Sequence, residues 1–375
     1  MVGDRRIKVY FFYKSINKNH TASNNRFWAI YKMTSKNFLT EVIEIEPLKA
    51  SLNKYKLLRG LNLRFQIIIK TISLFKVPKG NENNVIYLFS VDPLLSLWFY
   101  LFSLLSGFKL VSERNELPTC TIKNKKINEK INKLLLYPWY FKMFHGYSFI
   151  TNKIYEYYKP FLSSNQIHII LPMTVDFSRF NRTKKKPKEK YIFYAGSLNN
   201  RKDGVHYLIK AFSTVVKQFI DIRLIIVGNS SRKEVKDIQD LITELGIDNV
   251  RYLGQISRDQ IPNYTRNALL CVLPRPDSTQ ASGGFPTKLG EYLASATPVI
   301  TTNVGEIPDY LTEQEVYYIS KNNIQEELAE KIVDVIFNKD QARIVGHNGY
   351  AKAKKCFSLE SNLHLIKYLI NTITN

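Results

Sequence analysis

Short apolar runs alternate with amphipathic segments along the first half of the chain. Residues 7–12 and 85–89 are apolar on both faces, which is typical of strands buried in a parallel sheet. Residues 26–34 and 61–75 instead repeat their apolar positions with the period of a helix. With shorter strands at 40–45, 109–112, 147–151 and 167–171, this half reads as alternating strands and helices.

The same alternation resumes near residue 191. Strands are predicted at 191–195, 223–227, 250–253, 268–273, 299–302 and 316–319, with helices between them. Right-handed crossovers then give an α/β fold with two Rossmann-like domains, each built on a parallel sheet, facing a cleft. We assign 1–178 to the first domain, the charged, aperiodic segment 179–190 to a linker and 191–356 to the second domain. The helix at 357–375 is expected to pack back on the first domain.

Two segments of the first domain carry unusual apolar surface. Residues 94–105 (LLSLWFYLFSLL) are too short to span a bilayer, and they follow the helix start Asp92-Pro93. We predict a buried crossover helix there, with interfacial membrane contact as the alternative. Residues 124–147 form a basic amphipathic segment that either lies on an anionic membrane or packs against its own domain.

Charge and cysteine content narrow the function classes. The net charge is +22, and the excess of Lys and Arg is concentrated in the first 180 residues. This favours an anionic membrane surface or nucleic acid as a partner, and the alternative is a general composition rich in Lys, Asn and Ile. Cys120, Cys271 and Cys356 fit no disulfide framework or metal spacing, and the N-terminus does not resemble a signal peptide, so we expect a cytoplasmic protein.

The stretch 282–308 is a candidate binding site. Gly283-Gly284 allows close backbone approach, and Pro286 suits a helix start, where free amides bind anions. Glu291 lies in that helix and can accept hydrogen bonds from a sugar hydroxyl pair. The alternative is an ordinary βα unit with a surface Glu. Residues 113–116, which directly follow a strand, are either a second site candidate or a solvated turn.

Four segments in order carry a family resemblance: YIFYAGSLNNRKDGVHYLIKAF, IRLIIVGN, VRYLGQIS and GGFPTKLGEYLASATPVITTNVGEIPDY. Together they resemble the C-terminal, nucleotide-sugar-binding domain of the retaining family 4 glycosyltransferases, which have the GT-B fold. The likeness covers about residues 190–312. KLVSERNELP in the first half looks like the strand and loop that face the donor sugar in this family.

The resemblance implies a role for each matching residue. Gly196 corresponds to the glycine turn after the first strand, and Lys202 to the lysine on the donor diphosphate. Glu291 corresponds to the second Glu of the E-x7-E motif, which holds the ribose. Gly283, Gly284 and Phe285 correspond to the loop whose amides meet the phosphate and the sugar. Arg114 stands at the position that in many relatives is a His near the donor sugar.

The sequence also departs from the family pattern. Gly283 stands where the first Glu of E-x7-E is expected, so the contact to the transferred sugar cannot be carried over. Ser197 stands where an Arg often follows the strand glycine, so Arg201 and Lys202 are expected to neutralise the diphosphate together. The usual Gly-Gly of the first N-terminal loop is replaced by Ala22-Ser23-Asn24.

The resemblance implies a retaining glycosyltransferase that moves a sugar from a UDP or GDP donor to a glycan or lipid-linked acceptor in surface polysaccharide synthesis. Arg114 and Lys202 would act in catalysis, without a cofactor or a metal ion. The enzyme would be peripheral at the inner face of the cell membrane and would not bind nucleic acid. The alternatives are a nucleotide-sugar 2-epimerase of the same fold and a basic nucleic-acid-binding protein.

Overall fold

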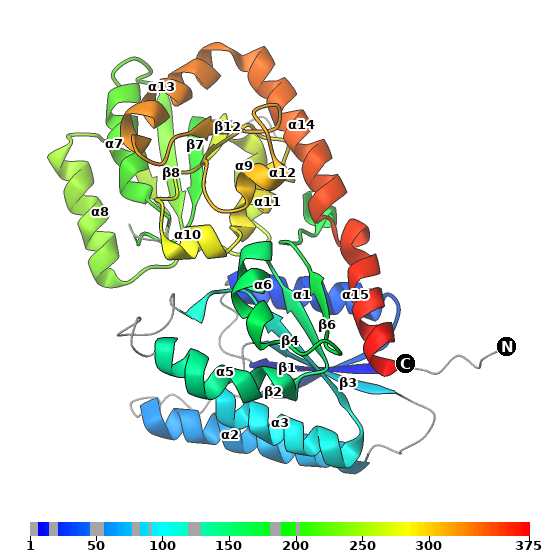
Figure 1. Cartoon of the computed structure of the whole chain (residues 1–375). Helices are drawn as coiled ribbons and strands as arrows, with labels where there is room; N and C mark the ends of the chain where they lie inside the picture. Colours follow the sequence, from blue (N-terminus) through cyan, green and yellow to red (C-terminus); the bar gives the residue numbers. More distant parts are fainter. Residues whose placement is uncertain are drawn as a thin grey trace. The chain divides into compact units, whose positions relative to one another are not determined.

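The computed structural model of this protein consists of two compact units (Figure 1). The first contains Met1–Leu171 and Asn362–Asn375, and the second contains Pro172–Ser361. The structure describes residues 7–14, 22–45, 56–76, 83–89, 92–118, 129–180, 189–199 and 203–375. Each unit is described by itself.

The first unit is built on a six-stranded parallel sheet with the order β2-β1-β3-β4-β5-β6. Its strands are β1 (Lys8–Lys14), β2 (Leu39–Ile45), β3 (Asn84–Phe89), β4 (Lys109–Arg114), β5 (Gly146–Phe149) and β6 (Ile167–Ile170). The main helices are α1 (Ala22–Ser35), α2 (Lys56–Ser73), α3 (Pro93–Ser106), α6 (Asn152–Tyr158) and α15 (Leu359–Thr374). Right-handed crossovers place α1 on one face of the sheet and α2, α3 and α6 on the other.

The second unit repeats this architecture with the strand order β12-β11-β10-β7-β8-β9, again parallel. Its strands are β7 (Lys190–Ala195), β8 (Ile222–Val227), β9 (Val250–Tyr252), β10 (Leu270–Leu273), β11 (Val299–Thr302) and β12 (Tyr317–Ile319). The helices are α7 (Val205–Val215), α8 (Arg232–Glu244), α9 (Ile261–Asn267), α10 (Thr279–Gly283), α11 (Thr287–Leu293), α12 (Ile307–Tyr310), α13 (Ile324–Phe337) and α14 (Lys339–Phe357). The fold class and the alternating pattern predicted from the sequence are confirmed.

The chain enters the second unit earlier than the boundary of 178 that we placed on the sequence. Met173 and Val175 are buried, and the Val175 amide donates to the Phe357 carbonyl at 2.8 Å. Phe180, which we assigned to the linker, closes the 3₁₀ helix η7 (Phe177–Phe180), and its carbonyl accepts from Arg266 Nη2. Apolar burial therefore moves the division between the units to 171, while residues 181–188 of the expected linker lie outside the described residues.

The C-terminal segment returns to the first unit. The Asn83 side-chain amide donates to the carbonyl of Thr374 at 3.0 Å. A Cβ on Gly146 of β5 would lie 2.8 Å from Leu369 of α15. The backbone of β5 and the apolar face of α15 are thus in direct contact.

Helix α3 is not the buried crossover helix that its composition predicts. Phe99 and Phe102 point into the core, but Leu94, Leu101 and Leu105 are exposed. Within the part of the chain that the structure describes, no helix is long and apolar enough to cross a membrane.

The basic amphipathic segment predicted at 124–147 is broken and ends at Met143, and its residues 124–128 lie outside the described residues. Its described part runs from residue 129 through the π-helix η4 (Asn132–Leu136), α5 (Tyr137–Tyr140) and the 3₁₀ helix η5 (Phe141–Met143). The helix geometry changes at Tyr137-Pro138, because proline lacks the amide that continues a helix. We call residues 129–143 the broken helix.

Candidate functional site

The second sheet has a topological switch point between β7 and β10. From β7 the chain proceeds outward through β8 and β9, and from β10 it proceeds the other way through β11 and β12. Open parallel sheets bind ligands beyond the carboxyl ends of the strands at such a point. The segments that emerge there are Gly196-Ser197 after β7 and Pro274-Arg275 after β10.

Asp203 is the centre of a charged cluster at this edge. Its carboxylate is buried and lies 3.0 Å from Lys288 Nζ and 3.9 Å from Arg275 Nε. It also accepts the Ser197 amide at 3.0 Å. The cluster thereby joins the loop after β7, the loop after β10 and the first turn of α11.

These contacts determine the charge state of the cluster. Burial by itself would raise the pKa of Asp203, but Lys288 and Arg275 outweigh it and hold the pKa below its ordinary value. The carboxylate is therefore ionised at neutral pH and orients both cations. Lys288, on the exposed side of the cluster, can present its ammonium group to an anionic ligand.

Two glycines allow the backbone to close tightly around this edge. A Cβ on Gly228 would lie 1.7 Å from the Gly196 carbonyl oxygen. Gly204 has φ +68°, and its Cβ would lie 2.2 Å from the Pro274 carbonyl oxygen. Only glycine fits at these two positions, because neither backbone oxygen can move aside.

Glu291 lies outside the Asp203 cluster and pairs with Arg179 of the same unit. Its Oε1 accepts a charge-assisted hydrogen bond from Arg179 Nη1 at 2.8 Å, and both side chains are mostly buried. Arg179 Nη2 also donates to the Arg258 carbonyl at 2.6 Å. Among the described residues, Arg179 is the only hydrogen-bond partner of the Glu291 carboxylate.

The structure gives parts of the glycine-rich loop another local role. Gly283 ends the one-turn helix α10, and the Gly284 amide donates to the Gln280 carbonyl at 3.0 Å. Phe285 is buried against the rings of Tyr310 and Phe357. The Gly284 amide is thus engaged here, and contact of Gly283, Gly284 and Phe285 with a ligand stays a prediction.

Arg114 belongs to the first unit, at the carboxyl end of β4. Its Nη2 donates to the Tyr140 hydroxyl at 2.5 Å, and its guanidinium lies over the rings of Tyr140 and Phe141. Its Nε is buried without a hydrogen-bond partner among the described residues. The contacts hold the group rigidly and leave part of its hydrogen-bonding capacity unused.

The neighbouring Glu113 is a structural residue. It is fully buried and accepts from Arg26 Nε at 2.9 Å and from the Tyr87 hydroxyl at 2.7 Å. Arg26 Nη2 continues the network to the Leu171 carbonyl at 2.7 Å. The hypothesis that residues 113–116 form one charged site is therefore wrong for Glu113, because both of its carboxylate oxygens already accept hydrogen bonds inside the core.

Of the other predicted site residues, Gly196 lies at the edge described above. Arg201 and Lys202 lie outside the described residues, between Asn199 and Asp203. The sequence reasoning missed Asp203, Arg275, Lys288 and Arg179. Lys288 could have been found, because it stands inside the glycine-rich motif, whereas Arg179 lies in a segment that has no motif.

Across the residues that the structure describes, no group of three or more His, Cys, Asp or Glu side chains could hold a metal ion. The cluster supplies two cations and one ionised carboxylate instead. Such an edge, with two cationic side chains and tight glycine turns, can bind a phosphate-containing ligand.

Comparison with known proteins shows that the segment around this site is similar to a known family. Residues 176–352 match the model of the family described as glycosyl transferases group 1. The matched segment holds the whole Asp203 cluster and Glu291.

A curated relative and two solved structures extend the comparison. The chain is 27% identical to the capsular polysaccharide biosynthesis glycosyltransferase CapM of Staphylococcus aureus over 207 residues, 53% of this chain and 52% of CapM. The chain therefore spans about half the length of this curated relative.

Among solved structures, sucrose-phosphate synthase from Thermosynechococcus elongatus has a TM-score of 0.74 at 14% identity, covering 98% of this chain and 99% of that one. HepE of Anabaena, solved with UDP and glucose, has a TM-score of 0.69 at 15% identity, covering 97% of this chain and 99% of its own. At these identities the likeness shows the fold, which is the two-domain GT-B fold that the resemblance predicted.

Proposed function

We propose that this protein is a glycosyltransferase that moves a sugar from a nucleotide-diphosphate donor to a glycan or lipid-linked acceptor. The observation that carries the proposal is the Asp203, Lys288 and Arg275 cluster at the switch point of the second sheet, inside the family segment. Nucleotides bind at such points in Rossmann-like sheets.

We assign the nucleotide to this edge. Glu291 would accept the ribose hydroxyls through the carboxylate oxygen that Arg179 leaves open. Lys288 would contact the diphosphate, together with Arg201 and Lys202, which immediately precede Asp203 in the sequence. UDP and GDP are the expected nucleotides, and HepE of Anabaena, of the same fold, was solved with UDP and glucose.

The proposed sugar transfer depends more on stabilisation of negative charge than on covalent catalysis. As the bond from the sugar to the diphosphate breaks, charge develops on the leaving phosphate, and fixed cations stabilise it. We infer that the reaction retains the anomeric configuration by attack on the face that the diphosphate leaves, with the leaving phosphate accepting the acceptor's proton. Arg114 is proposed to approach the donor sugar, and protein cations rather than a metal ion would neutralise the diphosphate.

We further propose surface polysaccharide synthesis as the setting, with action at the inner face of the cell membrane. The relation to CapM, a capsular polysaccharide biosynthesis glycosyltransferase, supports the first point. The excess of positive charge supports the second, because anionic lipids attract such a surface.

Titration calorimetry with UDP and GDP, and hydrolysis of UDP- and GDP-sugars with and without EDTA, test the proposal. Glu291→Gln and Lys202→Ala should each weaken nucleotide binding by about tenfold or more, because the first removes the charge from a hydrogen bond to the ribose and the second removes a charged donor to the diphosphate. The matched controls Glu244→Gln and Lys236→Ala, at exposed positions on α8, should bind as the wild type does. EDTA should leave hydrolysis unchanged.

If neither nucleotide binds, the donor assignment is wrong. If binding is intact but no sugar is released or transferred from any donor, the assignment as a transferase fails while the nucleotide site stands.

A further inference from the structure

Helix α3 has two serines on its buried side and five of its six leucines on its exposed side. Ser96 and Ser103 are buried, and the Ser103 hydroxyl donates to the Phe108 carbonyl at 2.6 Å. On the outer side, Leu104 and Leu105 are 63% and 70% exposed, and Leu94, Leu97 and Leu101 continue the stripe. Single exposed leucines are ordinary, but a full stripe along one helix indicates a surface that something apolar covers.

Both neighbours of α3 present apolar side chains in the same way. On α2, Phe65 is 63% exposed, and Ile69 and Ile72 follow it at helical spacing. On the broken helix, Leu134 is 76% exposed and is accompanied by Leu135 and Trp139. We call the exposed apolar side chains of these three helices the apolar face.

Direct contacts show that the three helices lie side by side, as Figure 1 also shows for α2, α3 and α5. Arg64 Nε of α2 lies 3.2 Å from Asp92 Oδ2 at the start of α3. Ser96 Oγ of α3 lies 3.3 Å from the Tyr140 hydroxyl of the broken helix. The exposed apolar side chains of the apolar face therefore lie on three neighbouring helices.

The charged residues on the helices of the apolar face are mostly basic. Residues 60–76 of α2 and its 3₁₀ extension include three basic residues and no acidic residue. Helix α3 has no charged side chain, and residues 129–143 include three lysines and one glutamate. A face with this charge attracts an anionic partner and repels a second copy of itself.

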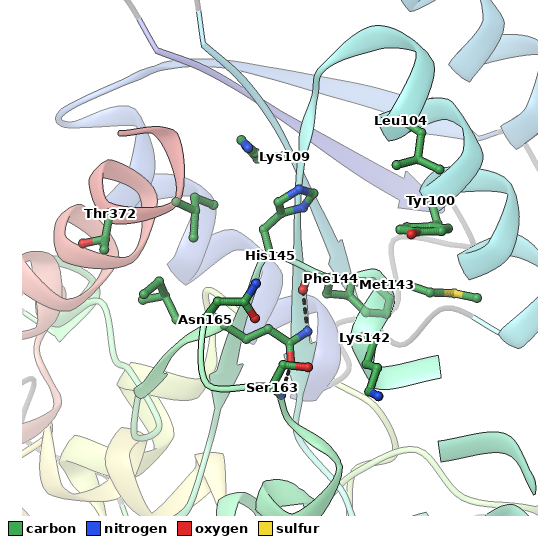
Figure 2. A pocket seen from close by; sticks show the side chains of 13 residues that line it. Tyr100, Leu104, Lys109, Lys142, Met143, Phe144, His145, Ser163, Asn165 and Thr372 are labelled. Atoms are coloured by element: carbon green, nitrogen blue, oxygen red, sulfur yellow. Dashed lines mark hydrogen bonds between the residues drawn. The ribbon is translucent and has the colours of Figure 1, made fainter. Parts of the chain in front are cut away.

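A basic pocket adjoins the carboxyl-terminal half of α3 (Figure 2). It has a volume of about 570 Å³, and Tyr100 and Leu104 of α3 form one wall. Lys109 and Lys142 also line it, no carboxylate does, and neither lysine forms an ion pair with any described residue. The pocket therefore offers two uncompensated positive charges next to the leucines.

From these observations we propose that the first unit docks on an anionic lipid bilayer through the apolar face, with a lipid phosphate in the Lys109 and Lys142 pocket. The leucines of α3 and the apolar side chains beside them enter the boundary between head groups and acyl chains, and the surrounding basic residues meet the anionic head groups. The docking deepens the membrane setting proposed above, but it depends on no step of the sugar transfer.

Flotation with phosphatidylcholine vesicles, with or without phosphatidylglycerol, tests the docking surface. The wild type should float with the phosphatidylglycerol vesicles and only weakly with phosphatidylcholine alone. Leu94→Gln, Leu101→Gln and Leu105→Gln combined should lower the partition by about tenfold or more, since each removes apolar surface from the contact. The matched control combines Ile220→Gln, Phe337→Gln and Ile344→Gln, exposed apolar positions of the second unit, and should float as the wild type does.

Lys109→Gln with Lys142→Gln tests the pocket, and should reduce the preference for phosphatidylglycerol while leaving the weak binding to phosphatidylcholine in place. Melting followed by circular dichroism checks that the variants are folded. Exposed leucines leave no cavity when replaced, so we expect unchanged melting.

The proposal is overturned if the wild type floats with neither vesicle or if the leucine variant floats undiminished. A wild-type dimer in light scattering that the leucine substitutions dissociate would likewise overturn it, by assigning the apolar face to a second copy. Hydrolysis of the donor without vesicles should be equal in wild type and leucine variant. A lack of hydrolysis in both, with normal flotation, would reject the proposed transferase and leave the docking intact.

Discussion

At the scale of single residues, the buried carboxylates of this protein have separate tasks. Glu113 satisfies Arg26 and Tyr87 inside the first unit and has no capacity left for a ligand. Asp203 orients Lys288 and Arg275 at the edge of the second sheet. Glu113 lies near the carboxyl end of β4 and Asp203 lies in the segment after β7, so both stand close to a strand end in the sequence, and their partners distinguish them.

Asp203→Asn should destabilise the second unit by about 3 kcal/mol at neutral pH, because it removes one partner from a mostly buried charge cluster. Denaturant unfolding, followed by hydrogen exchange of the β7 and β10 amides, measures the loss. Asp221→Asn is the matched control, since Asp221 pairs with Lys190 at 2.6 Å but both side chains are well exposed, and it should have little effect.

The stability lost in Asp203→Asn should depend on pH through the pKa of Asp203. The pKa of Asp203 is lower in the folded protein than its ordinary value of 3.8. The stabilisation is therefore present above that value and is lost as the pH falls through the lower folded pKa. The gap between wild type and Asp203→Asn should be widest near neutral pH and should close in stronger acid. A gap that stays constant with pH would contradict this assignment.

At the scale of elements, small residues decide how closely α14 packs. A Cβ on Gly346 would lie 2.8 Å from the Ala296 carbonyl oxygen and 3.0 Å from the Pro298 nitrogen. A Cβ on Gly349 would lie 2.7 Å from the Glu315 carbonyl oxygen. These contacts are with backbone, so they cannot be relieved by turning a side chain.

Gly346→Ala should therefore destabilise the second unit by about 1 to 3 kcal/mol, despite the better helix propensity of alanine. Gly60→Ala is the opposite case, because Gly60 lies inside α2 with nothing within 4 Å of its added Cβ. It should stabilise the protein by about 0.5 to 1 kcal/mol. Thermal unfolding of the two variants gives the comparison, and the same sign for both would refute the packing argument.

The helices also show how far periodicity can predict structure. The apolar content of α3 predicted full burial, whereas the fold buries Ser96, Ser103, Phe99 and Phe102 and exposes five of the six leucines. A helix that is apolar all round has no polar side to orient it. Its rotation is decided by the neighbours, here the contact of Ser96 with the Tyr140 hydroxyl, the bond from Ser103 to the Phe108 carbonyl and the ring contact of Phe75 with Phe102.

At the scale of the whole molecule, the chain builds the first unit from both of its ends. Leu369 of α15 packs against Gly146 of β5, more than two hundred residues away in sequence. Leu328 of α13 is instead buried in the core of the second unit. The two units thus have separate cores, and local stability should be separable as well.

Leu369→Ala should lower the free energy of opening that hydrogen exchange measures for the β5 amides by about 2 to 5 kcal/mol. It should leave the value for the β8 amides unchanged. Leu328→Ala should have the reverse effect by a similar amount. Native-state hydrogen exchange with mass spectrometry resolves the two. Equal loss in both units from either variant would mean that they unfold as one.

The sequence by itself determined the alternation of strands and helices, the α/β class and the likeness of 190–312 to a nucleotide-sugar-binding domain. These are local properties, because side-chain period, turn glycines and short motifs act within a few residues. It also placed Glu291 and Gly196 in the segment that now forms the candidate site, and their contacts with a ligand remain predictions.

Only the tertiary structure decided which distant residues meet. It joined Arg179 to Glu291, joined Asp203 to Arg275 and Lys288, and moved the division between the units to residue 171. It also turned the leucines of α3 outward and set α2 and the broken helix beside them. Such outcomes depend on packing and charge compensation between segments far apart in the chain, which the pattern of any one segment does not contain.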